Sequence, residues 1–251
     1  MKASESLHGK VALVTGSSRG IGRAIVLALV RHGVKVGLLA PAFAKKELLA
    51  VKKEIEALQG QVLVIVADIR NERSMNKAVK RLTKKFGQVD ILVNNAGVGC
   101  IDQVVNQKLD DFKKQMEVNF LGSVNCTLAV LPQMVKRKAG DIVNISSLTS
   151  LRGETNYAGY CASKAAVLRF GEGLFDELRA KGIRVMTICP GSVSTGSFSG
   201  SGKAPNAPSE LIKLRVEDVA DTLIHLVSLP RRATITEVHV EPTIKPVHRR
   251  S

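Results

Sequence analysis

Short apolar runs alternate with longer segments of helical periodicity over almost the whole chain. The run at 10–15 (KVALVT) is rich in β-branched residues, and the apolar positions of 21–32 recur with the spacing of one helix face. The expected strands are 10–15, 34–39, 61–67, 91–93, 141–146, 183–189 and 234–240, and the expected helices are 21–32, 45–58, 72–86, 109–138, 157–181 and 216–229. Because each crossover between parallel strands needs an intervening helix, the pattern predicts an α/β fold. We expect a doubly wound, parallel, seven-stranded sheet with helices on both faces.

Residues 1–251 are expected to form a single domain, because no stretch has the composition of an interdomain linker. The loosest segment, at about 195–210, is rich in serine, glycine and proline and lies between an expected strand and the last expected helix. Two interpretations stay open for it. Its position favours a flexible lid over a substrate cleft, and the alternative is a solvated loop.

The composition is that of a globular protein, with 45% hydrophobic and 24% charged residues. The N-terminal segment lacks the apolar core of a signal peptide, and the other apolar runs are short and interrupted, so we expect no membrane span. The cysteines, Cys100, Cys126, Cys161 and Cys189, are widely spaced and form no CxxC pair. We therefore expect a cytoplasmic location and no metal site.

The formal net charge of +15 raises the question of nucleic-acid binding, because lysine and arginine dominate contacts with phosphate. The basic residues, however, are spread over several expected helices instead of forming one cluster. We interpret them as solvated helix faces that also attract an anionic cofactor or substrate, and we expect no nucleic-acid partner.

A glycine-rich loop at 15–22 (TGSSRGIG) connects the first expected strand to the first expected helix. Gly16 permits a tight turn, Gly20 lets the backbone approach a pyrophosphate, and Gly22 allows close packing of the helix. The N-terminus of the helix adds unpaired N–H groups and the positive end of its dipole. The loop therefore predicts a dinucleotide site, with a purely structural turn as the alternative.

The spacing G-x-x-x-G-x-G resembles that of the short-chain dehydrogenase/reductase family, and the chain is similar to the 3-oxoacyl-[acyl-carrier-protein] reductases within it. Later motifs extend the resemblance over nearly the whole chain, beginning with the segment 94–97 (NNAG) after the fourth expected strand. The resemblance implies a Rossmann-type domain that binds a nicotinamide cofactor. The cofactor contacts that it implies are Gly16, Ser18, Arg19, Gly20, Ile21, Gly22, Asp68, Ile69, Asn95, Ala96, Gly97, Tyr160, Lys164, Pro190, Gly191, Val193 and Thr195.

Two parts of this set have structural alternatives, Asp68 and the segment that begins at Pro190. Asp68 ends the third expected strand, where the family places a carboxylate against the adenine amino group, but a turn-capping aspartate is the alternative. Pro190 and Gly191 match a segment that lies against the nicotinamide, and Thr195 would touch the carboxamide. An ordinary turn at the end of a strand is the alternative for that segment.

The choice of cofactor depends on the end of the second expected strand. NAD-specific folds commonly place an acidic residue there for the ribose 2′-OH, whereas residues 38–41 (LLAP) contain no carboxylate. Arg19 stands where similar reductases use a basic residue for the 2′-phosphate. We therefore expect NADP(H) in preference to NAD(H), although the basic residue that many NADP enzymes of the family carry at position 41 is a proline here.

Tyr160 and Lys164 are four residues apart, so they lie on the same face of the expected helix. A phenol with its ordinary pKa of about 10 is a sluggish proton carrier near neutral pH, and a neighbouring ammonium is expected to lower that pKa. The other tyrosine, Tyr157, has Cys161 at the corresponding position. The pair therefore predicts an acid/base that protonates an alkoxide.

The resemblance adds two residues to this pair. Ser147 precedes Tyr160 by thirteen residues, the family's spacing for the serine that hydrogen-bonds the substrate oxygen. Ser146 is the competing assignment, although it would point to the other face of a continuing strand. Asn119 matches the family's asparagine of the proton relay, and a polar residue in a helix packed between subunits is its alternative. We expect Asn119, Ser147, Tyr160 and Lys164 to be the catalytic residues.

The sequence therefore favours an NADPH-dependent oxidoreductase that acts on a small-molecule carbonyl or alcohol, including a 3-oxoacyl thioester. An NAD(H)-dependent alcohol or hydroxysteroid-type dehydrogenase, a catalytically silent dinucleotide sensor and an epimerase-type enzyme are the alternatives. The resemblance implies a homotetramer or homodimer. It also implies docking of an acyl carrier protein at Lys138 and Lys181, for which basic residues that complement helix dipoles are the alternative.

Overall fold

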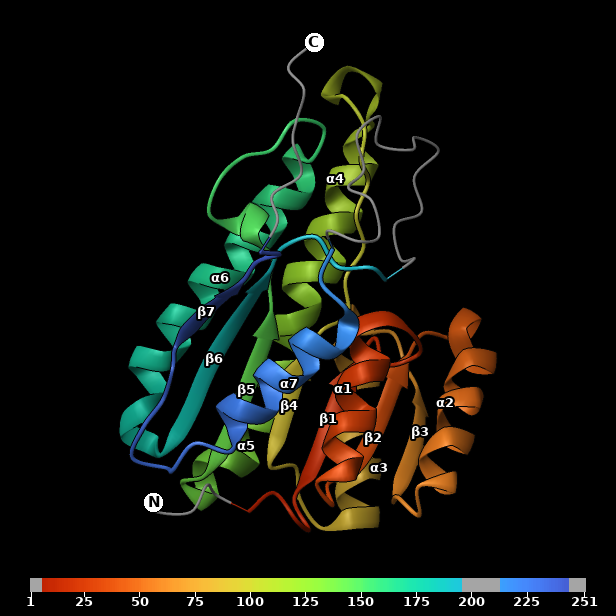
Figure 1. Cartoon of the computed structure of the whole chain (residues 1–251), viewed down its shortest axis with the longest axis vertical. Helices are drawn as coiled ribbons and strands as arrows, with labels where there is room; N and C mark the ends of the chain where they lie inside the picture. The colour runs from red at the N-terminus through yellow and green to blue at the C-terminus, as the bar shows by residue number, and fades with distance from the viewer. Residues whose placement is uncertain (1–5, 196–212, 244–251) are drawn as a thin grey trace.

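The computed structural model describes residues 6–195 and 213–243. Within them, one parallel sheet runs through the molecule in the strand order β3-β2-β1-β4-β5-β6-β7 (Figure 1). The strands are β1 (Val11–Thr15), β2 (Lys35–Ala40), β3 (Val62–Val66), β4 (Ile91–Asn94), β5 (Gly140–Ile145), β6 (Ile183–Pro190) and β7 (Glu237–Val240). The predicted seven-stranded sheet is thereby confirmed. Most of the expected substrate loop, at about 195–210, lies outside the described residues.

Helices cover both faces of the sheet, as the pattern predicted (Figure 1). The apolar faces of α1, α2 and α7 form one core layer, and those of α3, α5 and α6 form the other. Because both faces are covered, the central strands are buried along their whole length, as in other parallel sheets. The helices are α1 (Gly20–Arg31), α2 (Lys45–Ala57), α3 (Glu72–Phe86), α4 (Leu109–Gln115), α5 (Gly122–Arg137), α6 (Ala158–Leu178) and α7 (Val216–Val227).

The single long helix expected at 109–138 is interrupted by a π-helical turn, Met116–Leu121, between α4 and α5. The turn holds one extra residue, and the apolar periodicity continues on both sides of it, so the sequence pattern did not separate the two helices. Turns of this kind are frequent at functional sites. Asn119 lies within it.

The same helical stretch, Leu109–Arg137, is long and apolar enough to cross a membrane by length and composition. A helix in the core of a globular protein passes the same test, and α5 packs against β4, β5 and α3. The stretch is therefore weak support for a membrane span.

The sheet order reverses between β1 and β4, because the chain first builds outward to β3 and then returns to the other side of β1. In open α/β sheets, ligands bind outside the carboxyl ends of the strands at such a switch point. The carboxyl ends of β1 and β4 are at Thr15 and Asn94. The fold thus directs attention to the segments that follow these two residues.

An ion cluster near the amino ends of β5 and β6 links these two strands to the end of α7. Asp141 and Arg184 are paired residues of β5 and β6, and both side chains are almost fully buried. The Asp141 carboxylate accepts hydrogen bonds of 2.8 Å from Nε and Nη2 of Arg184 and one of 2.5 Å from Nη1 of Arg231. Arg184 also donates to the main-chain oxygens of Val227 and Leu229. The buried Asp141–Arg184 pair therefore links two strands, and Arg184 connects them to the end of α7.

Candidate active site

The glycine loop after β1 has the backbone that its sequence predicted. Gly16 and Gly20 have φ angles of +63° and +54°, a region that favours glycine. A Cβ on Gly16 would lie 2.8 Å from Cα of Ala96, and a Cβ on Gly22 would collide with the carbonyl oxygen of Gly16. Side chains at these positions would therefore collide with the loop itself and with the segment that follows β4.

The N-terminus of α1 offers backbone donors to an anion. Arg19 occupies the N-cap position with an extended backbone, and among the described residues no side chain caps this end of the helix. The first turn contains no acidic residue that would compete for the N–H groups. Ser18 and Ile21 are partly buried on either side of the exposed Arg19. These residues fit the pyrophosphate of a dinucleotide cofactor.

Hydrogen bonds tie the glycine loop to the segment after β4. Thr15 Oγ1 accepts from the main-chain N–H groups of Asn95 and Ala96, at 3.0 Å each. The Asn95 side chain donates to the carbonyl oxygens of Thr15 and Gly16, at 2.9 and 3.2 Å. The loop is therefore held in place before any ligand binds. Thr15 is an anchor that the sequence reasoning did not identify.

Replacing Gly22 with Ala is expected to lower stability by about 1–3 kcal/mol, the usual cost of inserting a methyl group into a packed site. The new Cβ would meet the Gly16 carbonyl and lie 2.5 Å from Asn95 Nδ2, so the loop must shift and affinity for NADPH should fall. Thermal unfolding and NADPH titration would measure both effects. The matched control is Gly173→Ala in α6, where no atom lies within 4 Å of the added methyl group. If both variants unfolded and bound NADPH alike, the proposed steric role of Gly22 would be wrong.

Asp68 is engaged by a neighbour that sequence reasoning missed. Its carboxylate accepts from the main-chain N–H and Nε of Arg70, at 3.0 and 3.1 Å, and from Nη2 at 2.6 Å. Hydrogen bonds from Arg70 hold the pKa of Asp68 below its usual value. The bond from the N–H of Arg70 shows that Asp68 caps a local turn, which was the alternative role for this residue. An adenine amino group could therefore contact the Asp68 carboxylate only by sharing it with Arg70. Ile69, beside it, is buried and packs near Gly122.

Tyr160 meets Ser147 at the carboxyl end of the sheet. The Ser147 hydroxyl is close enough to the phenol to oppose the rise of its pKa, and Ser147 Oγ accepts from Oγ1 and the main-chain N–H of Thr149. Ser146 points elsewhere, because its buried hydroxyl donates to the carbonyl oxygen of Lys164 at 2.9 Å. Of the two adjacent serines, Ser147 is the one placed against the phenol.

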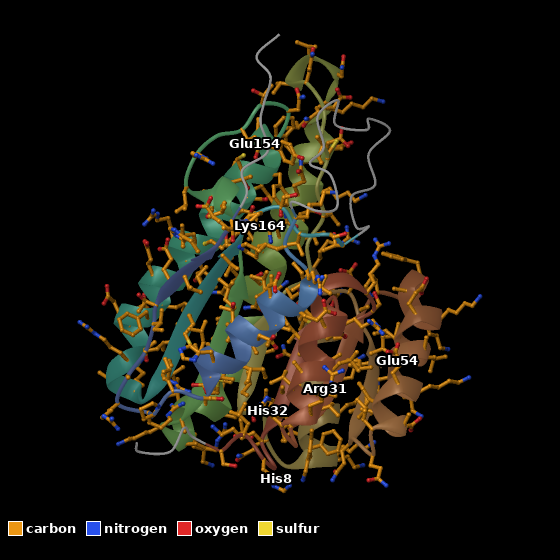
Figure 2. All side chains as sticks on the ribbon, in the orientation of Figure 1. His8, Arg31, His32, Glu54, Glu154 and Lys164 are labelled. Carbon is orange, nitrogen blue, oxygen red and sulfur yellow. The ribbon has the colours of Figure 1, made fainter. Side chains whose placement is uncertain are left out.

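Lys164 lies below the same tyrosine. Its Nζ is 5.7 Å from the ring centroid of Tyr160 and donates to the carbonyl oxygen of Ile145 at 2.8 Å. Figure 2 shows Lys164 near the ends of the strands, far from His8 and His32 at the opposite edge of the sheet. Burial lowers the pKa of Lys164 to about 8.

The expected lowering of the Tyr160 pKa is wrong for the chain by itself. Burial raises the pKa of the phenol above its usual value, and the hydrogen bond with Ser147 opposes this rise without cancelling it. The ammonium group of Lys164 is directed to the carbonyl of Ile145 instead of to the phenol oxygen. The spacing correctly predicted that Tyr160 and Lys164 lie in one site. It did not predict that burial would affect the pKa of the phenol more than the ammonium group does.

Asn119 comes close to Lys164 from the π-helical turn. Its side-chain oxygen accepts from the N–H of Val98 at 2.8 Å, and its amide donates to the Val98 carbonyl and to Ser163 Oγ. A Cβ on Gly97 would lie 3.3 Å from Oδ1 of Asn119 and 3.4 Å from Nζ of Lys164. Asn119, Lys164 and Gly97 therefore converge on one small space beside the tyrosine.

The end of β6 forms another wall of this region. Pro190 is the last residue of the strand, and the N–H of Gly191 donates to the carbonyl oxygen of Val240 at 2.8 Å. A Cβ on Gly191 would lie 3.2 Å from a methyl group of Leu148, which follows Ser147. Val193 forms a bridge with Leu214, and Thr195 is partly buried. The segment 190–195 thus starts next to the serine and tyrosine.

Comparisons with known proteins agree with this geometry. A family model described as short chain dehydrogenase matches residues 10–205. A 3-oxoacyl-[acyl-carrier-protein] reductase of Synechocystis sp. is 35% identical over 235 residues, which cover 92% of this chain and 94% of that protein. A reductase of the same description from Thermotoga maritima is 33% identical over 230 residues, which cover 88% and 92%. A metagenomic short-chain oxidoreductase solved in complex with NADP is 31% identical, with a TM-score of 0.82 and coverage of 96% and 100%.

Proposed function

Because this chain belongs to the short-chain dehydrogenase family and is an NAD(P)-dependent oxidoreductase, we propose that it reduces a carbonyl group with NADPH, with Tyr160 as proton donor. The reverse reaction oxidises the corresponding secondary alcohol. The observation that carries the proposal is the buried Lys164, whose Nζ lies 5.7 Å from the centre of the Tyr160 ring, with Ser147 close enough to the phenol to affect its pKa.

The residues of the chain divide the work of proton transfer. A bound nicotinamide supplies the hydride. Ser147 donates a hydrogen bond to the substrate oxygen, and Tyr160 transfers its hydroxyl proton to that oxygen as negative charge develops there. Lys164 places a positive charge under the same site and thereby favours the phenolate that remains. Asn119 fixes the neighbouring segment through its two hydrogen bonds to Val98.

NADP(H) is the proposed cofactor in preference to NAD(H). β2 ends at Ala40 without a carboxylate that would repel a 2′-phosphate, and Arg19 is exposed at the start of α1. The solved relative at 31% identity was in complex with NADP. A guanidinium can bind a phosphate through two parallel hydrogen bonds, so Arg19 is the natural partner for this group.

Replacing Arg19 with Ala is expected to weaken NADPH binding about 10- to 150-fold, because hydrogen bonds to charged groups contribute about 1.5–3 kcal/mol. NADH binding should change little, since NADH lacks the 2′-phosphate. Fluorescence titration with both cofactors would give the two dissociation constants. Arg73→Ala, an exposed arginine in the first turn of α3, is the matched control. Equal losses for NADPH and NADH would contradict the assignment of Arg19 to the 2′-phosphate.

The proposed substrates include 3-oxoacyl thioesters, which the names of the two reductases suggest. Docking of a carrier protein at Lys138 and Lys181 receives less support. Both residues precede the amino ends of β5 and β6, whereas Ser147 follows the carboxyl end of β5. A six-residue strand spans about 20 Å. The placement favours the alternative that these lysines complement helix ends.

The function is tested by following NADPH oxidation at about 340 nm with aldehydes, ketones and a 3-oxoacyl thioester. The proposal expects turnover with at least one of these classes, and the thioester result decides the finer substrate assignment. A protein that binds NADPH but turns over none of them would be a dinucleotide-binding protein without this activity.

A homotetramer or homodimer and a cytoplasmic location complete the proposal. Leu121 and Leu128 are exposed on the helical stretch before and within α5, and Phe120 meets Phe170 of α6 edge to face. Exposed apolar side chains beside a packed aromatic pair suit a contact between copies of the chain. Light scattering of the purified protein would give the number of subunits.

A further inference from the structure

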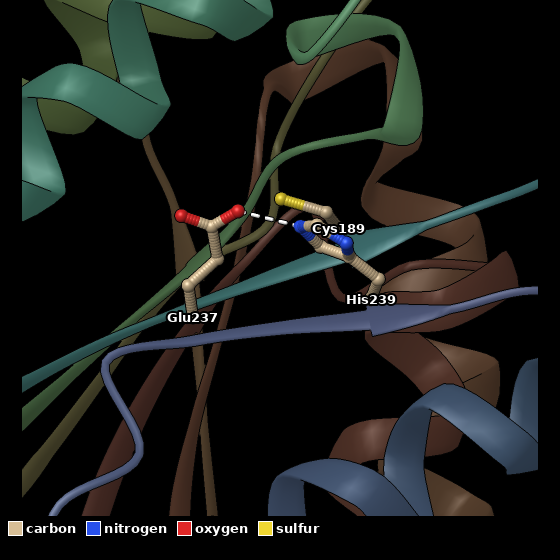
Figure 3. A group of neighbouring side chains, drawn as sticks. All are labelled: Cys189, Glu237 and His239. Atoms are coloured by element: carbon tan, nitrogen blue, oxygen red, sulfur yellow. Dashed lines mark hydrogen bonds and ion pairs between the residues drawn. The ribbon is translucent and has the colours of Figure 1, made fainter.

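Three side chains with different donor atoms meet at the β7 edge of the sheet. Cys189 of β6 is the direct partner of His239 on β7, and Glu237 lies two residues before His239 on the same face of β7. The sulfur, a ring nitrogen of His239 and a carboxylate oxygen of Glu237 all lie within 4.8 Å of one another. Figure 3 shows the thiol and the carboxylate converging on the imidazole.

The donor set is that of a transition-metal site. A thiolate, an imidazole and a carboxylate are the side-chain ligands of Zn²⁺, with bonds of about 2.3 Å to sulfur and about 2.0–2.2 Å to nitrogen and oxygen. In a tetrahedral site these bond lengths separate the ligand atoms by roughly 3.3–3.6 Å. Here Nε2 of His239 is 2.5 Å from Oε1 of Glu237, and the sulfur is at most 4.8 Å from the others. Shifts of about 1 Å in the side chains of Glu237 and His239 therefore suffice for coordination.

We propose that Cys189, Glu237 and His239 form a binding site for Zn²⁺ or a divalent ion of similar chemistry. Three protein ligands leave the fourth position of a tetrahedron to water. On binding, the thiol of Cys189 releases its proton to solvent, and His239 coordinates through Nε2 as the neutral tautomer that carries its proton on Nδ1.

The surroundings of the three ligands suit this role. Cys189 is buried and fixed by its strand, whereas His239 is exposed and Glu237 partly exposed, so an ion can enter from the solvent side. Ser150 Oγ lies 3.8 Å from the sulfur and donates to the carbonyl oxygen of Ser147 at 2.6 Å, so rotation of this hydroxyl would turn its proton to a thiolate. Two ligands come from paired positions of adjacent strands, which hold the ligand backbones more firmly than a loop would.

This site was not predictable from the sequence, because Cys189 is about fifty residues from the other two ligands and the motif E-x-H is common on ordinary strands. The pairing of β6 with β7 brings them together. None of the three residues belongs to the proposed set of catalytic residues, although Cys189 lies close enough to Lys164 for their charges to interact.

The test uses the full-length protein without a histidine tag and with Zn²⁺ or Co²⁺ alone as the probe. Calorimetric titration with Zn²⁺ should give one site per chain, and Co²⁺ should produce a thiolate-to-metal charge-transfer band with the intense visible bands of a tetrahedral ion. Cys189→Ser should abolish the charge-transfer band, and His239→Gln should weaken Zn²⁺ binding at least tenfold. Circular dichroism and NADPH binding would establish that both variants are folded.

Two variants serve as matched controls, Cys100→Ser for the thiol and His225→Gln for an exposed histidine of α7. Both should bind Zn²⁺ and Co²⁺ as the unchanged protein does. Absence of saturable Zn²⁺ binding, or a Co²⁺ spectrum unaffected by Cys189→Ser, would overturn the proposal and leave an ordinary His239–Glu237 ion pair over a packed cysteine.

Discussion

Replacing Tyr160 with Phe is expected to lower kcat about 10²- to 10⁴-fold, the usual contribution of a positioned general acid. The variant loses one oxygen atom and keeps the ring that packs edge to face with Tyr157, at a centroid distance of 6.3 Å. The fold and the NADPH affinity should therefore be nearly unchanged. Steady-state kinetics with the best carbonyl substrate, together with NADPH titration, would separate chemistry from binding.

The chain offers a close control for this experiment, since Tyr157 and Tyr160 are its two tyrosines. Tyr157→Phe removes the same atom one helical turn earlier and should cause a much smaller loss of kcat. Full activity in Tyr160→Phe, or equal losses in the two variants, would sink the assignment of Tyr160 as proton donor. A large loss of NADPH affinity in Tyr160→Phe would instead indicate a role in cofactor binding.

Replacing Asp141 with Ala is expected to destabilise the protein by about 3–5 kcal/mol, because Arg184 would remain buried without a counter-charge. Arg231 would lose its partner as well. The cluster lies near the amino ends of the strands, whereas Tyr160 lies at their carboxyl ends. The substitution should therefore lower the free energy of unfolding without changing the kinetics of the folded enzyme. Urea unfolding followed by circular dichroism would measure it.

An exposed ion pair provides the comparison. Asp176→Ala removes the partner of Arg179, whose contact of 3.6 Å is largely solvated, and should cost less than about 1 kcal/mol. The double variant Asp141→Leu/Arg184→Met should be less destabilised than Asp141→Ala, because no uncompensated Arg184 charge stays buried. If Asp141→Ala unfolded no more readily than Asp176→Ala, the buried cluster would have no special part in stability.

The fold could be predicted from the sequence because each strand and helix carries its own periodicity. Runs such as 10–15 and 183–189 are mostly apolar and do not alternate between apolar and polar residues, as expected for strands buried on both faces. The helices between them show one apolar face. The glycine loop was also predictable, since its spacing reflects a local backbone requirement. In these regions, the information that determines the structure is contained in a short stretch of the chain.

Other features of the site depend on contacts between distant residues and were not predictable in this way. The sequence spacing placed Lys164 under Tyr160, but the direction of its ammonium is set by the carbonyl of Ile145 on another element. Arg70 binds the Asp68 carboxylate that was predicted to contact adenine, and this contact depends on the conformation of the turn after β3. Lys138 and Lys181, predicted as docking residues, precede the amino ends of β5 and β6, whereas Ser147 follows the carboxyl end of β5.

The π-helical turn at Met116–Leu121 also determines how this stretch tolerates changes in length. Successive residues of a helix are rotated by about 100°, so one extra residue turns everything after it by that angle. Upstream of the turn, α4 presents one face, and downstream α5 presents Cys126, Val130 and Met134 to the core. Deleting a single residue here would restore a regular helix and turn either Asn119 away from Lys164 or the apolar face of α5 away from the sheet. Insertions and deletions should therefore be excluded from this short stretch even where most of its side chains can be exchanged.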